Sequence, residues 1–266
     1  MSDISISDPT LPLVRKLGVF IRLSDKELSM LRELGSELNE FEQDTNFVTV
    51  GEPLSNVYLL EKGWAIRHKL TLAGERMITN FVLPGDFFCV NAPLFDVSDH
   101  SVTAVTSVTV AKISIEKFID AMKVSPRIAL AIAWCAAKEE SLIEEHLVNT
   151  NKRTAYARLA HLLIELWRRL EIRKLTDGGR FPLPVTQLDL ADSLGLSIWY
   201  VNRLIQKMRR DRLVSIDARA PRQVQIANPR GLAKAAGFES EYLHYTEVPA
   251  RTARIFGSKS GRHKSD

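Results

Sequence analysis

The stretch LADSLGLSIWYVNRLIQKMRR, residues 190–210, decides the fold of the C-terminal half of this chain. Its second part has two stripes of side chains, each recurring at the three- and four-residue steps of a helix. The first stripe is apolar and suits a core: Val201, Leu204, Ile205 and Met208. The second is mostly polar or basic: Trp199, Arg203, Gln206 and Arg210. Burial explains only the first stripe, so the second predicts contact with another molecule.

Three residues predict two short helices joined by a tight turn. Ala191 is small enough to let the two helices cross closely, and Gly195 can adopt the positive φ that the turn requires. Ser197 can cap the second helix by accepting from its free N–H groups. This spacing predicts a helix-turn-helix.

A pair of strands is predicted directly after this motif. LVSI (213–216) and QVQI (223–226) alternate as paired strands do, and the link between them carries Arg219 and Arg222. Helix, helix and two-stranded wing together are much more specific than any one of them. We therefore expect a winged helix-turn-helix domain over residues 151–237.

The second stripe then predicts a DNA-reading surface on a recognition helix over 197–210, because the N-terminal end of such a helix enters the major groove. Arg203 is the strongest candidate, since its planar fork can bind guanine O6 and N7 together. The candidates for base readout are Trp199, Tyr200, Asn202, Arg203 and Gln206. The candidates for phosphate contact, which position without reading sequence, are Ser197, Lys207, Arg209, Arg210 and Arg222.

The charge distribution agrees with a polyanionic partner for the C-terminal half. Residues 1–120 carry 11 Lys/Arg and 17 Asp/Glu, whereas residues 181–266 carry 14 and 8. A solvated basic surface would give the same counts, so charge alone does not decide. The basic stretch 247–266 is expected to be a disordered tail.

The N-terminal half has the pattern of a small β domain. Short runs rich in Val, Ile and Phe are interrupted by Gly51, Gly63, Gly74 and Gly85 at nearly equal intervals. Such spacing predicts an antiparallel sandwich or roll, and we expect a β-roll domain over residues 15–123. The fold class is therefore α+β.

A long helix is predicted between the two domains, over 124–150, beginning at Ser125-Pro126. Its first half is apolar nearly all round, which indicates burial on several sides. We expect it to pack against its twin in a homodimer, along a seam formed by Ile128, Ile132, Cys135 and Leu142.

This order of elements resembles the Crp/Fnr family of bacterial transcription regulators. The resemblance rests on GEPLSNVYLLEKGWAIRHKL (51–70), AGERMITNFVLPGDFF (73–88) and LPVTQLDLADSLGLSIWYVNRLIQKMRRDRLVSI (183–216). It implies a homodimer joined through the long helix, a two-fold-symmetric DNA operator and RNA polymerase as a further partner. Family members often have Glu where Trp199 stands, so their operator half-site does not carry over.

The resemblance also limits the effector. Members that bind cyclic AMP have a G-E-L turn and an Arg-Ser pair, where this chain has Cys89-Val90-Asn91 and His100-Ser101. We expect no cyclic AMP binding, because no fixed cation remains for the phosphate. The iron–sulfur branch uses N-terminal cysteines, and residues 1–40 contain none, which excludes that cluster.

The haem-containing branch is similar around Gly85 to Cys89, but Asn91 replaces the histidine, so haem is not expected either. The β-roll is then a sensor whose signal is unidentified and whose cofactor is unknown. Its expected effector pocket consists of Phe88, Cys89, Asn91, His100 and Ser101.

Other function classes find little support. No HExxH pattern, Gly-rich phosphate loop or nucleophile elbow is present, so we expect neither a metal site nor an enzyme. The longest apolar run, 128–137, is too short to span a membrane, and two cysteines suit a reducing cytoplasm. One alternative stays open: a cyclic-nucleotide-type regulatory subunit whose C-terminal module binds protein.

Overall fold

A computed structural model describes residues 11–217 and 222–256. Its helices are α1 (Leu11–Gly18), α2 (Asp25–Leu34), α3 (Ile115–Val124), α4 (Pro126–Lys152), α5 (Ala155–Glu171), α6 (Gln187–Leu194), α7 (Ile198–Arg210), α8 (Pro229–Ala236), the 3-10 turn η1 (Glu241–Leu243) and α9 (Ala250–Ile255). Its strands are β1 (Leu38–Phe41), β2 (Asn46–Val48), β3 (Asn56–Lys62), β4 (Ala65–Leu70), β5 (Arg76–Val82), β6 (Phe87–Phe88), β7 (Ser101–Ala104), β8 (Val108–Ser114), β9 (Arg180–Pro182), β10 (Val214–Asp217) and β11 (Gln223–Ile226). Among the helices of these ranges, none is long and apolar enough to cross a membrane.

The N-terminal domain is the predicted antiparallel roll, and it has the jelly-roll-like form of two sheets. Their strand orders are β1-β8-β3-β6 and β2-β7-β4-β5, with antiparallel neighbours throughout. Gly85 takes φ +86°, and a Cβ there would lie 2.7 Å from the backbone nitrogen of Leu13. Only glycine therefore lets α1 pack against the turn before β6.

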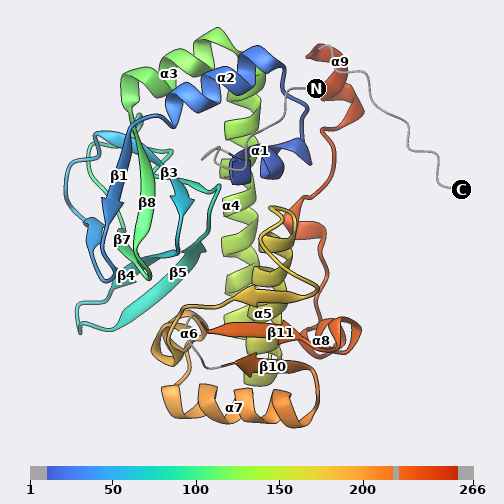
Figure 1. The fold of residues 1–266 in the computed structure, drawn as a ribbon. Coiled ribbons are helices and arrows are strands. Elements are labelled where there is room, and N and C mark those ends of the chain that lie inside the picture. The colour runs from blue at the N-terminus through green and yellow to red at the C-terminus, as the bar shows by residue number, and fades with distance from the viewer. Residues whose placement is uncertain (1–10, 218–221, 257–266) are drawn as a thin grey trace, which may run out of the picture.

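Helix α4 runs the length of the molecule, beside the roll in its first part and beside the C-terminal domain in its last (Figure 1). Ser125 caps it and Pro126 occupies its first turn, as predicted. The expected dimer seam is wrong, however. Its four residues are buried inside the protomer at 7% exposure or less: Ile128, Ile132, Cys135 and Leu142.

The physical reason for this error is the composition of α4. In a helix that is apolar on nearly every side, the hydrophobic pattern does not single out one buried side. Periodicity therefore could not tell the side of α4 that faces the roll from the side that faces out. The outward apolar and small residues are instead Ala133, Ala136, Ile143, Leu147 and Val148.

The C-terminal domain confirms the winged helix-turn-helix. Helices α5, α6 and α7 pack around a second core, and β10 pairs with β11 as the wing. Strand β9 pairs with β11 as a third strand of this sheet. The predicted wing residue Arg219 lies outside the described residues.

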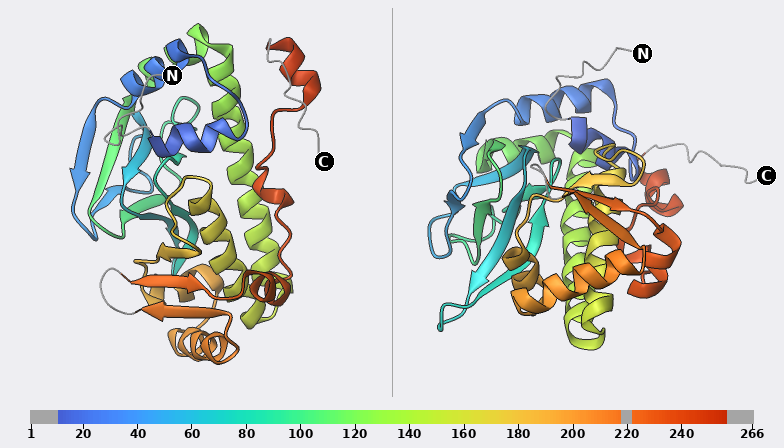
Figure 2. Two further views of the ribbon diagram at one scale, coloured as in Figure 1. Left: turned by 45° about the vertical axis from the view of Figure 1, so that its right-hand side comes forward. Right: turned by 60° about the horizontal axis from the view of Figure 1, so that its bottom comes forward.

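Residues 238–256, here called the C-terminal segment, correct the prediction of a disordered tail. The segment leaves α8 and runs back along α4 to the other end of the molecule, where it forms α9 (Figure 2). The Val248 N–H donates to the Phe20 carbonyl at 2.9 Å, and Leu243 is fully buried. Composition missed this because the anchors are single apolar residues in a polar stretch; residues 257–266 lie outside the described ranges.

Candidate nucleic-acid interface and sensor cavity

The geometry of α7 follows from its first and last turns. Gly195 adopts φ +61° and donates its N–H to the Ala191 carbonyl, which ends α6. Ser197 accepts from the Tyr200 N–H at 3.3 Å and so begins α7. The apolar stripe is buried as predicted, and this fixes which side of the helix faces out.

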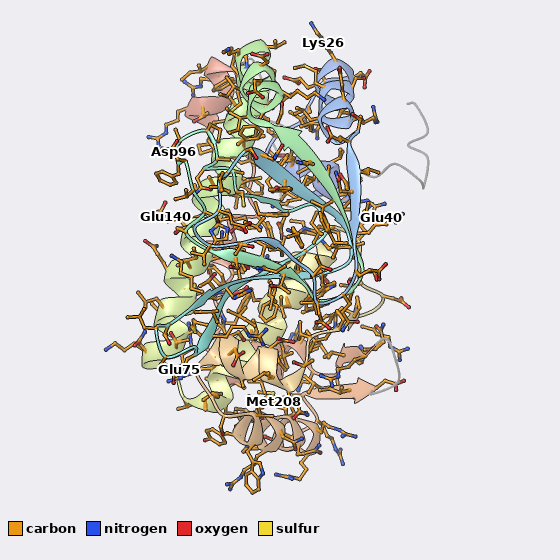
Figure 3. All side chains as sticks on the ribbon, turned by 90° about the vertical axis from the view of Figure 1, so that its left-hand side faces the viewer. Lys26, Glu40, Glu75, Asp96, Glu140 and Met208 are labelled. Carbon is orange, nitrogen blue, oxygen red and sulfur yellow. The ribbon has the colours of Figure 1, made fainter. Side chains whose placement is uncertain are left out.

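The predicted base-reading residues all lie on that outward side. Each one is exposed, and Trp199 is 85% exposed: Trp199, Tyr200, Asn202, Arg203 and Gln206. In Figure 3, side chains of the helix that carries Met208 project away from the rest of the molecule. Within the described residues Arg203 and Gln206 have no hydrogen-bond or ion-pair partner, whereas the Asn202 amide donates to the Gln187 side-chain oxygen at 3.1 Å.

The predicted phosphate-contacting residues differ in how free they are. Arg209 and Arg210 are exposed, with no hydrogen bond or ion pair to the described residues. Lys207 pairs with Asp211 at 2.8 Å and lies 4.4 Å from the Tyr156 ring centre. Arg222 is half-buried and donates to the Val185 carbonyl at 3.0 Å. Ser197 is exposed at the first turn, and the role of all these residues on phosphate stays a prediction.

A contact that the sequence did not indicate joins the roll to the helix-turn-helix. Arg76, at the start of β5, donates to Asp189 and to Asp192 of α6, both at 2.7 Å. Asp189 also accepts from the backbone N–H of Thr186 in a capping box. The position of α6, and with it α7, therefore depends on a hairpin of the N-terminal domain.

A cavity of about 390 Å³ lies between the roll and α4. Four of the five residues predicted for an effector pocket line it: Phe88, Cys89, Asn91 and His100. Ser101 does not, and its hydroxyl accepts from the Val50 N–H at 3.1 Å. Ala136, Glu139 and Ile143 of α4 complete the wall.

Comparison with known proteins assigns both parts of this chain. Residues 157–235 match the Crp-like helix-turn-helix domain, and residues 38–125 match the cyclic nucleotide-binding domain. The chain is 31% identical to the transcriptional activatory protein AadR of Rhodopseudomonas palustris, over 76% of this chain and 87% of that protein. The chain belongs to the Crp/Fnr family of transcription regulators.

Two further likenesses agree with this assignment. The nitrogen fixation regulation protein FixK of Bradyrhizobium diazoefficiens is 29% identical, over 76% of this chain and 84% of that protein. The solved structure of FixK2 from Bradyrhizobium japonicum has the same fold, with a TM-score of 0.68 and 23% identity over 76% of this chain and 98% of that one. This Crp/Fnr regulator has a helix-turn-helix DNA-binding domain and is not an enzyme, and the comparisons do not favour the alternative of a protein-binding regulatory subunit.

The cavity of this Crp/Fnr regulator contains charges that sequence reasoning missed. We expected no fixed cation there, but β4 places Arg67 and Lys69 in the lining. Arg67 pairs with Glu139 at 3.0 Å and Lys69 with Asp99 at 3.0 Å. The expectation was wrong because it considered only the segment after Gly85, whereas these cations come from a strand that precedes it. The sequence did contain a signal for them, because Arg67 and Lys69 are two residues apart in the predicted strand and therefore lie on the same face of it.

Cys89 stands beside a histidine and a carboxylate in the same wall. Its Sγ lies 3.7 Å from His100 Nε2, and His100 Nδ1 lies 2.7 Å from Asp99. Burial raises the pKa of the Cys89 thiol to about 12 and lowers the pKa of His100. The hydrogen bond from His100 lowers the pKa of Asp99 to about 2. At neutral pH the thiol is therefore protonated and weakly nucleophilic.

Proposed function

We propose that this Crp/Fnr regulator binds a two-fold-symmetric DNA operator as a homodimer, with α7 of each protomer in the major groove. The observation that supports it is the outward side of α7, where Arg203 and Gln206 are exposed and have no partner among the described residues. Arg203 reads guanine, Asn202 and Gln206 bind adenine or phosphate, and Trp199 and Tyr200 contact a thymine methyl or a sugar. Arg209, Arg210, Lys207, Ser197 and Arg222 contact phosphate.

The dimer forms through the outward side of α4. Ala133, Ala136 and Ile143 are exposed there, as is Leu147. Together with Glu140, these residues recur along α4 at alternating three- and four-residue steps. This is the pattern of contact positions on a helix that packs side by side with a second helix. Ala136 and Ile143 also line the roll cavity, so the proposed dimer contact borders that cavity. The dimer places the two copies of α7 about 34 Å apart, one turn of B-DNA.

The roll acts as the sensor, and its cavity of about 390 Å³ holds a small effector. Cyclic AMP is a poor candidate, because Glu139 and Asp99 already neutralise the two cations of the wall. The regulator works in the cytoplasm, where its remaining partner is RNA polymerase. Calorimetric titration of the purified protein with cyclic AMP tests whether cyclic AMP is the effector, and we expect no binding.

Selection from random DNA followed by fluorescence anisotropy tests the DNA assignment. We expect paired half-sites, and Arg203→Ala should lose about 1–3 kcal/mol of discrimination at one base pair per half-site. Arg251→Ala, which removes the same charge on exposed α9, is the matched control and should leave the preference unchanged. Unpaired half-sites would argue against the dimer, and an unchanged preference in Arg203→Ala would argue against the groove assignment.

A further inference from the structure

A cluster of buried cations lies where α1, α4, α5 and the C-terminal segment meet. Its members are at most 4% exposed: Lys16, Asp86, Lys138, Arg169 and Arg173. Four of these five residues are basic. Asp86 comes from the turn before β6, so the cluster also joins the roll to the C-terminal domain.

Asp86 has no capacity left for further donors. Its Oδ1 accepts from Lys16 at 2.6 Å and from Arg173 at 2.5 Å. Its Oδ2 accepts from Arg169 at 3.1 Å and from the Leu83 N–H at 3.0 Å. Two hydrogen bonds to each carboxylate oxygen use its lone pairs.

Glu165, a buried carboxylate that contacts Arg169, is also fully engaged. Glu165 accepts from both His146 and Tyr242, at 2.9 and 3.0 Å, and from Arg169 at 3.4 Å. Neither acid can therefore serve the donors that remain.

Several buried donors of the cluster have no partner within the described residues. They are Lys138 Nζ, Arg169 Nε, Arg173 Nε and Nη1, and the Tyr245 hydroxyl. Lys138 Nζ lies 3.7 Å from the centre of the Tyr245 ring, so the C-terminal segment covers it. The ring face attracts a cation but supplies no lone pair in place of water.

Loss of a proton from Lys138 would not by itself satisfy all the unpartnered donors of the cluster. Burial, and then the charges of Lys16 and Arg173, lower the pKa of Lys138, so its amine can become neutral. A guanidinium cannot do this, and Arg173 has two unpartnered nitrogens, Nε and Nη1, in a side chain that is 0% exposed. The cluster is thus short of both acceptors and negative charge.

We propose that a small inorganic anion of the chloride class binds between Lys138 and Arg173, beneath Tyr245. It supplies the lone pairs that Asp86 and Glu165 cannot, and its charge balances the excess cation. The site lies outside the roll cavity, does not depend on DNA binding, and couples anion concentration to the seating of the C-terminal segment.

Thermal unfolding of the full-length protein at constant ionic strength, with gluconate replacing chloride, tests the proposal. Specific binding to the folded state should raise Tm by about 3–5 °C for each tenfold rise in chloride above the Kd. Crystals grown in bromide should show an anomalous peak beside Lys138 and Arg173, a result that needs no variant.

Lys138→Met should abolish the chloride dependence of Tm, while Lys152→Met, on the exposed last turn of the same helix, should retain it. A chloride response that is unchanged in Lys138→Met overturns the proposal. A flat response in the wild type also overturns it and means that an uncharged Lys138 amine is enough. A bromide peak without any Tm response means an adventitious ion only, and counts against the proposal equally.

Discussion

The exposed arginines of α7 and the buried arginines in and just after α5 carry the same charge in opposite surroundings. Arg203, Arg209 and Arg210 are exposed and make no side-chain hydrogen bond or ion pair with the described residues, although the charge of Arg210 helps to lower the pKa of Asp211. Arg169 and Arg173 are instead almost fully buried around Asp86. Exposed guanidinium groups stay hydrated and available to a polyanion, which is the role proposed for these three. Buried ones have already given up water and hold two domains together. The two sets therefore share a residue type and differ in burial, which leaves only the exposed set available to a partner.

Removing Asp86 should have the largest effect on this contrast. Asp86→Ala leaves Lys16, Arg169 and Arg173 buried without their shared counter-ion, which should cost about 3–5 kcal/mol of unfolding free energy. Urea denaturation measures it, with Asp96→Ala, an exposed acid of the same domain, as control. Equal stability of the two variants would mean that the buried cluster does not join the domains.

The pH dependence of stability extends the comparison of buried and exposed groups to histidine, and His161 is the buried example. It is fully buried in the second domain, and burial lowers its pKa to about 4. A group with a lowered folded pKa stabilises the protein above its unfolded pKa of about 6.5, and this stability is lost as the pH falls towards 4. The shift is worth about 3 kcal/mol at most.

The change in unfolding free energy between pH 7 and pH 4 should thus be smaller in His161→Gln than in wild type. His244→Gln, which removes an exposed histidine, should follow the wild-type curve. Parallel curves for His161→Gln and the wild type would contradict the assignment of acid sensitivity to this buried ring.

Arg76 is the intermediate case, since it is partly exposed and pairs with Asp189 and Asp192. Arg76→Ala should free α6 from the roll and cost about 1.5–3 kcal/mol before solvent screening reduces it. Hydrogen exchange of the α6 amides should accelerate. Lys69→Ala, which breaks a more exposed pair in the same hairpin, should leave them protected; faster exchange there as well would make the effect a general loosening of the roll.

Arg209→Ala should have the smallest effect on the folded protein. The side chain is exposed, so stability should stay within about 0.5 kcal/mol. DNA affinity should fall alike for all sequences, and the salt slope of binding should decrease by about 0.9 for each phosphate that the variant no longer neutralises, which a salt titration measures. A change in sequence preference would instead assign Arg209 to base readout.

Local pattern was sufficient for the helix-turn-helix and the roll. Gly195, Ser197 and the apolar stripe of α7 act within a few residues of one another, so their spacing is visible in the chain. The cluster around Asp86 is different, because its hydrogen bonds join residues 70 to 87 positions apart and leave no periodic signal. The phase of α4 was hidden for the same kind of reason, since only packing shows which of its apolar sides faces the roll.

The path of the C-terminal segment has a consequence for biosynthesis. Residues 238–256 leave the ribosome after the roll, α4 and the winged domain, yet Tyr245 covers Lys138 and Val248 binds Phe20. The Tyr245 ring therefore cannot cover the Lys138 amine before the last part of the described chain has been synthesised.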